Sequence, residues 1–356
     1  MADEVLPTAQ LVWHNIADWG VEGKGWTDSE HYYDRFPAKA KGVVRPPVWN
    51  LSTHSAGLCT RFQTDATTIK ARWTLRSSTL ALPHMPSTGV SGLDLYVQVR
   101  EPYTSDDHTR QWRWLGVGIP DSNPQIEKDL IAGLVPALRT YLLYLPLYNG
   151  VESVEIGVPE GATFIPVPPR ESKPIVFYGT SIMQGGCASR PGMCHTAILG
   201  RYLDRVVVNL GFSGSGTMDI EIGGLMSELD ACIYVIDCLP NMSPEMVTER
   251  TVPLVRIIRE TRPNTPIVLV EDRTYGNSHM KPNQQDLQAK MRAALHQAFT
   301  YLVESGDTNL HYITGDGLLG DDDEATVDGS HATDLGFMRM AEVLEPVLRT
   351  LVTKDA

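Results

Sequence analysis

A serine, an aspartate and a histidine stand where they could form a catalytic set. Ser181 follows the apolar stretch from Pro174 to Tyr178, which predicts a buried strand that ends at a glycine and a threonine. Open parallel sheets bind ligands at the carboxyl ends of their strands, so we expect Ser181 in a crevice. Asp328 and His331 lie three residues apart, close enough for the carboxylate to fix the imidazole tautomer. Because a serine hydroxyl is a poor nucleophile without a base, Ser181 is the natural partner of that histidine.

Two further strands are expected to end in hydrogen-bond donors. The apolar run from Val206 to Leu210 leads into the glycine-rich loop Gly211 to Gly216, where the backbone can approach a ligand closely. A third strand, Ala231 to Cys238, is followed by Asn241. Backbone N–H groups and an Asn side chain are donors that stabilise the negative oxygen of a tetrahedral intermediate. The three strand ends therefore offer a nucleophile, an amide donor and a side-chain donor.

This order of blocks resembles the SGNH (GDSL-type) hydrolases, whose four blocks carry Ser, Gly, Asn and His. The resemblance implies that Ser181 is the nucleophile and that Asp328 and His331 are the acid and base. It also implies an oxyanion hole formed by Ser181, Gly214 and Asn241.

The sequence departs from the family pattern in two blocks. The first usually reads Gly-Asp-Ser, but Thr180 replaces the acid here. The third usually reads Gly-x-Asn-Asp, whereas this chain reads Leu-Pro-Asn-Met from Leu239 to Met242. Neither departure removes a residue that performs the chemistry. The resemblance extends from about Lys173 to Arg349, and the departures indicate an outlying branch.

The first half of the chain reads as all-β. Residues Thr68 to Arg76 alternate apolar and polar side chains with the period of a half-buried strand. A strand is also predicted from Leu93 to Arg100, and Asn149-Gly150 predicts a hairpin within Tyr141 to Gly157. Short strands with such turns favour a sandwich or jelly roll.

One five-residue motif adds to the resemblance. The segment from Gly92 to Tyr96 reads GLDLY and resembles the GxDLY signature of an N-terminal β domain that precedes a subset of SGNH hydrolases. An ordinary strand entry, with Leu93 and Leu95 facing the core, would explain the segment as well. We assign no catalytic role to Asp94.

A proline-rich stretch, Phe164 to Arg170, marks the expected domain boundary, because three prolines there favour a stiff extended link. We therefore predict a β-sandwich, jelly-roll-like domain over residues 1–168 and a hydrolase domain over residues 169–356. Beyond Lys173 strands alternate with helical segments, which predicts a three-layer α/β/α fold around a parallel sheet. We hypothesise that the first domain walls one side of the ester site, on the basis of its tryptophans Trp13, Trp19, Trp26, Trp112 and Trp114.

The composition excludes several classes of partner. A formal charge of −13 and a pI near 5.2 argue against binding to nucleic acid or to anionic membranes. No apolar run approaches the ~18 residues that a membrane span needs. The acidic N-terminus lacks the features of a leader, and five cysteines suggest reduced thiols, so a cytoplasmic location is expected.

No cofactor and no metal is predicted. The glycine-rich loop lacks the Lys-Ser/Thr of a phosphate-binding P-loop. The histidines outside the candidate triad show no paired ligand spacing, as in His195, His279, His296 and His311.

The expected function is that of a serine esterase acting on a small-molecule or saccharide ester. By family resemblance, small-acyl esters are favoured, especially acetyl groups on carbohydrates. Two alternatives stay open: an acyltransferase that uses the same acyl-enzyme, and a carbohydrate-binding protein with an inactive catalytic domain. A metal-dependent hydrolase is more distant, because no ligand set is visible. The sequence leaves the oligomeric state open.

Overall fold

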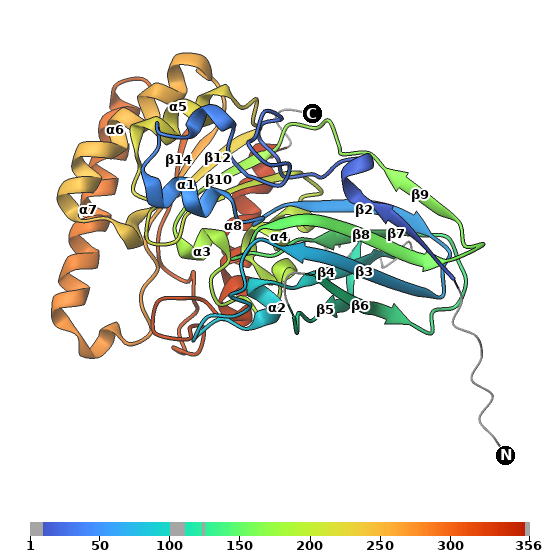
Figure 1. The fold of residues 1–356 in the computed structure, drawn as a ribbon. Helices are drawn as coiled ribbons and strands as arrows, with labels where there is room; N and C mark the ends of the chain where they lie inside the picture. Colours follow the sequence, from blue (N-terminus) through green and yellow to red (C-terminus); the bar gives the residue numbers. More distant parts are fainter. Residues whose placement is uncertain (1–9, 100–110, 123–124, 353–356) are drawn as a thin grey trace.

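The computed structural model describes residues 10–99, 111–122 and 125–352. The N-terminal residues 1–9, on which the absence of a leader was argued, lie outside this part, as does Arg100, the predicted end of a strand. The described chain forms an α/β unit and a β sandwich that lie side by side (Figure 1). None of its helices combines the length and the apolar character needed to cross a membrane.

A five-stranded parallel sheet forms the centre of the α/β unit, in the order β11-β10-β12-β13-β14. Its strands are near-continuous apolar runs, as expected where both faces of a sheet are covered. β10 lies between β11 and β12, so the residue after β10 is flanked by two other strand ends. The strands are β10 (Ile175–Gly179), β11 (Val207–Gly211), β12 (Ile233–Asp237), β13 (Ile267–Val270) and β14 (Leu310–Ile313).

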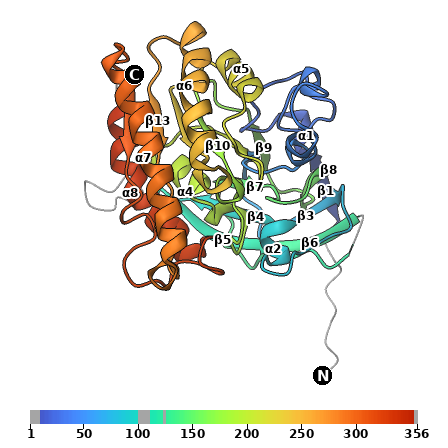
Figure 2. The same cartoon turned by 90° about the vertical axis from the view of Figure 1, so that its left-hand side faces the viewer.

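Helices cover both faces of this sheet. Phe177 of β10 packs into one layer with Leu199 and Phe337, whereas Val176 packs into the opposite layer with Leu254. Figure 2 shows the helices of the second layer side by side. The predicted three-layer fold is thus confirmed. The first layer holds α4 (His195–Tyr202) and α8 (Asp334–Val352), and the second holds α5 (Ile220–Glu228), α6 (Pro244–Thr261) and α7 (Pro282–Glu304).

Two antiparallel sheets form the sandwich, in the orders β1-β8-β3-β6 and β5-β4-β7-β2-β9. The core between them includes Trp73 and Tyr141, one from each sheet. The predicted all-β architecture is therefore confirmed. The strands are β1 (Leu11–Asn15), β2 (Cys59–Thr64), β3 (Thr68–Leu75), β4 (Leu93–Gln98), β5 (Trp112–Gly118), β6 (Gln125–Ala132), β7 (Arg139–Tyr144), β8 (Val151–Pro159) and β9 (Phe164–Val167).

The hairpin predicted around Asn149-Gly150 is wrong. The strands on either side, β7 and β8, belong to different sheets. A two-residue type I′ turn needs positive φ at both central residues, and neither Asn149 nor Gly150 has it. The Asn149 side chain is buried and instead exchanges two hydrogen bonds of 3.0 Å with the Ser77 backbone. The dipeptide therefore ties a crossing between the sheets to a neighbouring loop.

Short helical segments connect these elements. The α-helical ones are α1 (Pro46–Ser52), α2 (Ser87–Val90) and α3 (Ser181–Gln184). The 3-10 turns are η1 (Ile16–Asp18), η2 (Ala38–Ala40), η4 (Pro191–Met193), η5 (Leu239–Asn241) and η6 (Ser278–Met280).

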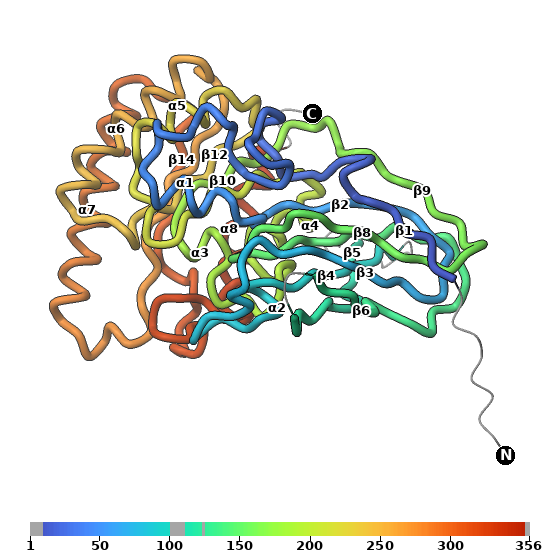
Figure 3. The backbone as a smooth tube through the Cα atoms, in the orientation of Figure 1, coloured from blue at the N-terminus to red at the C-terminus, as the bar shows by residue number. Residues whose placement is uncertain are grey.

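The segment that contains η2 and α1 leaves the sandwich and lies on the α/β unit, where the blue tube runs beside α5 (Figure 3). Phe36 and Val48 of this segment are fully buried in the same layer as α5 and α6. The first part of the chain thus contributes core residues to the second. The boundary near residue 168 stays a prediction.

The acidic residue of the GLDLY motif has a structural explanation. Asp94 is fully buried and binds three donors: the Arg190 guanidinium at 2.9 Å, the Gly192 N–H at 2.8 Å and the Trp114 indole N–H at 3.0 Å. Burial raises the pKa of Asp94, and Arg190 and the Gly192 N–H oppose that rise. Because Arg190 and Gly192 follow the short helix that begins at Ser181, Asp94 joins the sandwich to the loop after that helix.

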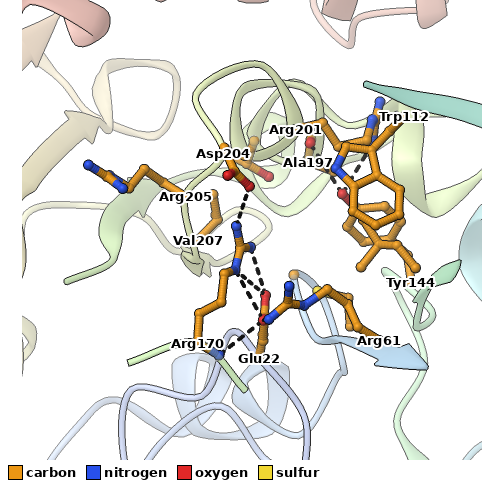
Figure 4. A pocket seen from close by; sticks show the side chains of 15 residues that line it. Glu22, Arg61, Trp112, Tyr144, Arg170, Ala197, Arg201, Asp204, Arg205 and Val207 are labelled. Carbon is orange, nitrogen blue, oxygen red and sulfur yellow. Dashed lines mark hydrogen bonds and ion pairs between the residues drawn. The ribbon is translucent and has the colours of Figure 1, made fainter. Parts of the chain in front are cut away.

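A second link between the units is an ion-pair network around Glu22 (Figure 4). Its buried carboxylate contacts Arg61 at 2.8 Å and Arg170 at 2.7 Å, and Arg170 also reaches Asp204 at 2.8 Å. The network lines a small pocket together with Val207, the first residue of β11. The pocket therefore lies at the amino ends of the strands, whereas Ser181 follows a carboxyl end.

We expect Asp94→Asn to lower the free energy of unfolding by about 3 kcal/mol, because removing one charge of a buried pair leaves the other without compensation. Urea unfolding of the variant and the wild type measures the difference. The control is Asp129→Asn, whose side chain is 57% exposed and whose pair with Lys70 is a surface pair worth little. Equal stability of Asp94→Asn and the wild type would contradict this account of the motif.

Candidate active site

The candidate nucleophile stands at a strand-to-helix turn in the middle of the parallel sheet. β10 ends at Gly179, Thr180 caps α3 by accepting a hydrogen bond from the Ile182 N–H, and Ser181 is the first residue of the helix. Gly185 ends the helix in a left-handed conformation with φ of 108°. Thr180, which replaces the family's acid, therefore serves as a helix cap at this position.

Ser181, His331 and Asp328 are brought together as their spacing suggested. The Ser181 Oγ lies 2.9 Å from the His331 Nε2, and the His331 Nδ1 lies 2.7 Å from the Asp328 Oδ2. The other carboxylate oxygen of Asp328 accepts hydrogen bonds from the N–H groups of His331 at 2.8 Å and Ser330 at 3.0 Å. The carboxylate thus fixes both the ring tautomer and the loop that carries the ring.

The electrostatics of this loop keep Asp328 ionised. Partial burial is the largest single influence and raises its pKa. Hydrogen bonds from the His331 N–H, the His331 ring and the Ser330 N–H together outweigh burial and lower the pKa of Asp328 to about 2. A carboxylate that is charged at neutral pH can stabilise an imidazolium when one forms.

The glycine-rich loop lies against the strand end that precedes the serine. A side chain at Gly216 would come within 2.1 Å of the Gly179 carbonyl oxygen, so only glycine allows this approach. The Gly216 N–H donates to the Asn241 Oδ1 at 3.2 Å, which leaves the Asn241 amino group as a donor. Gly214 is exposed, with φ of +66°. In the described part of the chain neither Gly214 nor Asn241 hydrogen-bonds to Ser181.

A buried glutamine positions the glycine-rich loop, and sequence reasoning missed it. The Gln184 Oε1 accepts the Ser213 N–H at 3.1 Å, and its Nε2 donates to the Leu147 carbonyl at 3.0 Å and lies 3.0 Å from the His54 Nδ1. Gln184 is fully buried in the last turn of α3. Gln184 therefore connects α3, the loop of Gly214 and the first part of the chain.

Two residues from the first 170 support the elements around Ser181, one at the turn itself and one at the end of β11. The Tyr148 hydroxyl donates to the Ser181 carbonyl oxygen at 3.0 Å. The buried Arg35 donates to the carbonyl oxygens of Asn209 at 2.9 Å and Gly211 at 2.8 Å, across more than 170 residues of sequence. Burial lowers the pKa of Arg35 to about 9, so it stays charged at neutral pH. No local sequence pattern marks these partners, because only the fold brings them near.

A buried charged cluster lies beneath the strand ends. Arg273 is fully buried, 3.7 Å from the Asp237 Oδ2 and 3.5 Å from the Asp272 Oδ1. Burial raises the pKa of Asp237 to about 6; Arg273 opposes this rise and Asp272 adds to it. Burial raises the pKa of Tyr275 to about 12, and Asp272 adds to this rise. The cluster thus lies at the carboxyl ends of β12 and β13.

One histidine of the first part of the chain comes near the candidate base, and the five tryptophans each have contacts of their own. The His84 ring lies edge-on to the His331 ring, with centroids 5.5 Å apart. It belongs to a turn in which Leu82 and Met85 exchange two hydrogen bonds of 3.0 Å. The tryptophan contacts are Trp13 with Arg72, Trp19 with the Arg61 carbonyl, Trp26 with Glu228, Trp112 with the buried cluster that includes Tyr96, Leu142 and Tyr144, and Trp114 with Asp94.

Comparisons with known proteins agree with this geometry. Residues 172–349 match the model of the GDSL-like lipase/acylhydrolase family, and residues 11–164 match the model of the N-terminus of SGNH-hydrolase-type esterases, named GxDLY. The chain belongs to the GDSL-like lipase/acylhydrolase family, and it is a carboxylic ester hydrolase of this class. No curated protein matches the sequence.

Several solved structures share the fold over nearly the whole chain. A protein from Bacteroides ovatus ATCC 8483, assigned as a GDSL-like lipase, is 33% identical with a TM-score of 0.89, covering 97% of this chain and 98% of its own. A salicylyl-acyltransferase from a tetracycline biosynthetic pathway is 20% identical with a TM-score of 0.74, covering 96% and 97%. A family two carbohydrate esterase from Cellvibrio japonicus is 12% identical with a TM-score of 0.60, covering 98% and 100%.

We expect Gln184→Met to lower the free energy of unfolding by about 2–3 kcal/mol, because the Leu147 carbonyl and the Ser213 N–H would be left buried without partners. Esterase kcat should fall as well, since the loop of Gly214 loses an anchor. Urea unfolding and ester hydrolysis measure the two effects. Gln285→Met, at an exposed position of α7, is the control. A Gln184→Met variant with wild-type stability and kcat would refute the anchoring role.

Proposed function

We propose that this protein hydrolyses small-acyl esters through an acyl-enzyme on Ser181. The observation that carries the proposal is the contact of Ser181 with His331 and of His331 with Asp328. The Ser181 oxygen attacks the ester carbonyl while the His331 Nε2 takes its proton, and the same nitrogen then protonates the departing alcohol. Water, deprotonated by His331, releases the acid and restores the serine.

The negative oxygen of each tetrahedral intermediate needs donors that are already in place. We assign this role to the backbone N–H groups of Ser181 and Gly214 and to the side chain of Asn241. The hydrogen bond from the Gly216 N–H to the Asn241 Oδ1 supports the assignment. It engages the oxygen of the Asn241 side chain, so the amino group is the part that can donate to a substrate. Each such donor contributes roughly 10²- to 10³-fold to kcat.

For the substrate we propose acetyl esters, including those of carbohydrates. The shared fold with family two carbohydrate esterases supports a saccharide alcohol. An exposed imidazole, His84, lies beside the candidate base and offers a polar group to the alcohol portion.

A second candidate function is acyl transfer to an alcohol acceptor other than water. The shared fold with the salicylyl-acyltransferase favours testing it, since the coverage is nearly complete for both chains. Both functions use the same acyl-enzyme and differ only in the group that accepts the acyl chain. A carbohydrate-binding protein without catalysis is disfavoured by the intact hydrogen bonds of Ser181, His331 and Asp328.

We expect the wild type to hydrolyse p-nitrophenyl acetate faster than the butyrate or octanoate ester, and Ser181→Ala to lower kcat by at least about 10⁴-fold with the fold intact. Nitrophenol release, with circular dichroism as the check of folding, makes the measurement. Ser305→Ala, at an exposed helix end, is the control.

Undiminished hydrolysis by Ser181→Ala would contradict the proposed nucleophile. Nitrophenol release without matching free acid, in the presence of an added alcohol, would favour acyl transfer over hydrolysis.

A further inference from the structure

A histidine, a cysteine and the candidate base approach one another at the mouth of the site. One nitrogen of His84, the Sγ of Cys187 and one nitrogen of His331 all lie within 4.8 Å of one another. These residues come from three segments: the turn before α2, the loop after α3 and the loop before α8. Sequence reasoning predicted no metal ligands, because about a hundred residues or more separate each of these positions from the next.

We propose that His84, Cys187 and His331 form a binding site for a borderline-soft divalent cation of the Zn²⁺ type, and that an occupied site stops catalysis. The inhibitory part rests on the proposed function, in which His331 is the base. Imidazole and thiolate are the ligands that Zn²⁺ prefers, and three protein ligands leave a fourth position for water.

The nitrogen of His331 that such a cation would take is fixed by its neighbour. The Nδ1 is held at 2.7 Å by the Asp328 carboxylate, so the Nε2 is the free ligand. A carboxylate on the second nitrogen is the arrangement that orients metal-binding histidines and makes them better ligands. The same Nε2 must accept the proton of Ser181, so a cation and catalysis compete for one lone pair.

The other two ligands differ in how firmly they are held. Cys187 is buried with φ of 72°, a conformation that side chains rarely adopt, and it packs in the α/β core. The thiolate, rather than the thiol, is the form of cysteine that binds a metal. A bound cation displaces the thiol proton to solvent, and the bond formed is from the thiolate to the metal.

His84 can adjust to complete the coordination. Tetrahedral Zn²⁺ with bonds of about 2.0–2.3 Å holds its ligand atoms roughly 3.5 Å apart, so the present separations must shrink by about 1 Å. His84 is exposed on its turn and can rotate toward the other two ligands. The turn itself is anchored, because Met85 is buried against the α/β core.

Calorimetric titration of chelator-treated Ser181→Ala protein with ZnCl₂ tests the site without relying on activity. We expect one Zn²⁺ per chain and an affinity at least about tenfold weaker when Cys187→Ala or His84→Ala is added. With CoCl₂ instead, we expect a thiolate-to-cobalt charge-transfer band that disappears in Cys187→Ala. His279→Ala, an exposed imidazole outside the cluster, should bind as the parent does.

Inhibition of p-nitrophenyl acetate hydrolysis by ZnCl₂ tests the consequence. Relative to its own metal-free rate, each of Cys187→Ala and His84→Ala should need at least about ten times more ZnCl₂ for half-inhibition than the wild type, and EDTA should restore the wild-type rate.

Absence of stoichiometric binding, binding that neither variant weakens, or a cobalt complex without a thiolate band would overturn the site. Stoichiometric binding by a protein that hydrolyses no ester would keep the metal site and refute the proposed function. Ester hydrolysis that depends on Ser181 and is insensitive to ZnCl₂ would do the reverse.

Discussion

The candidate active site depends on one contact, in which the Ser181 Oγ lies 2.9 Å from the His331 Nε2 although 150 residues separate them in the chain. Two features of the α/β unit make this contact possible. β10 occupies the interior of the sheet, which places Ser181 between the ends of two neighbouring strands. The loop of His331 immediately precedes α8, whose apolar face packs on the same layer as β10.

The β sandwich and the N-terminal segment contribute to the positions of the candidate catalytic residues. Arg35 holds two carbonyl groups of β11, Tyr148 holds the carbonyl of Ser181, and Asp94 binds the loop behind α3. These hydrogen bonds are buried, so losing them is expected to cost stability. The first part of the chain therefore supports the candidate site, and its turn at His84 also brings an imidazole beside His331.

Most of the α/β unit and the candidate triad could be predicted from the sequence, because both depend on residues that are close together in the chain. The strand before Ser181 is a continuous apolar run, and Asp328 and His331 are near neighbours in the chain. The hairpin at Asn149-Gly150 could not be judged in this way, because the Asn149 side chain is engaged by Ser77, which lies 72 residues away. The role of Gln184 could not be predicted for the same reason. Its hydrogen-bond partners are distant in the sequence, so only the folded structure shows which groups it satisfies.

The hypothesis that the first domain walls the ester site stays a prediction. Aromatic residues in a β-rich sequence fit a binding wall as well as they fit a core, and composition does not say which face of the sheet they occupy. At Trp114, for example, the Arg190 guanidinium lies over the ring and the indole N–H donates to Asp94. Asp94 shows the converse case, in which a motif residue without an evident role proves to hold the two parts of the chain together.

The most direct measurement of the central claim is labelling with a fluorophosphonate, which reacts with a serine only when a base activates it. Mass spectrometry of the labelled, digested protein should find one adduct per chain, on Ser181. The folded His331→Ala variant should remain unlabelled under the same conditions. A folded wild type that stays unlabelled, or an adduct on another residue, would contradict the proposal that Ser181 is a nucleophile activated by His331.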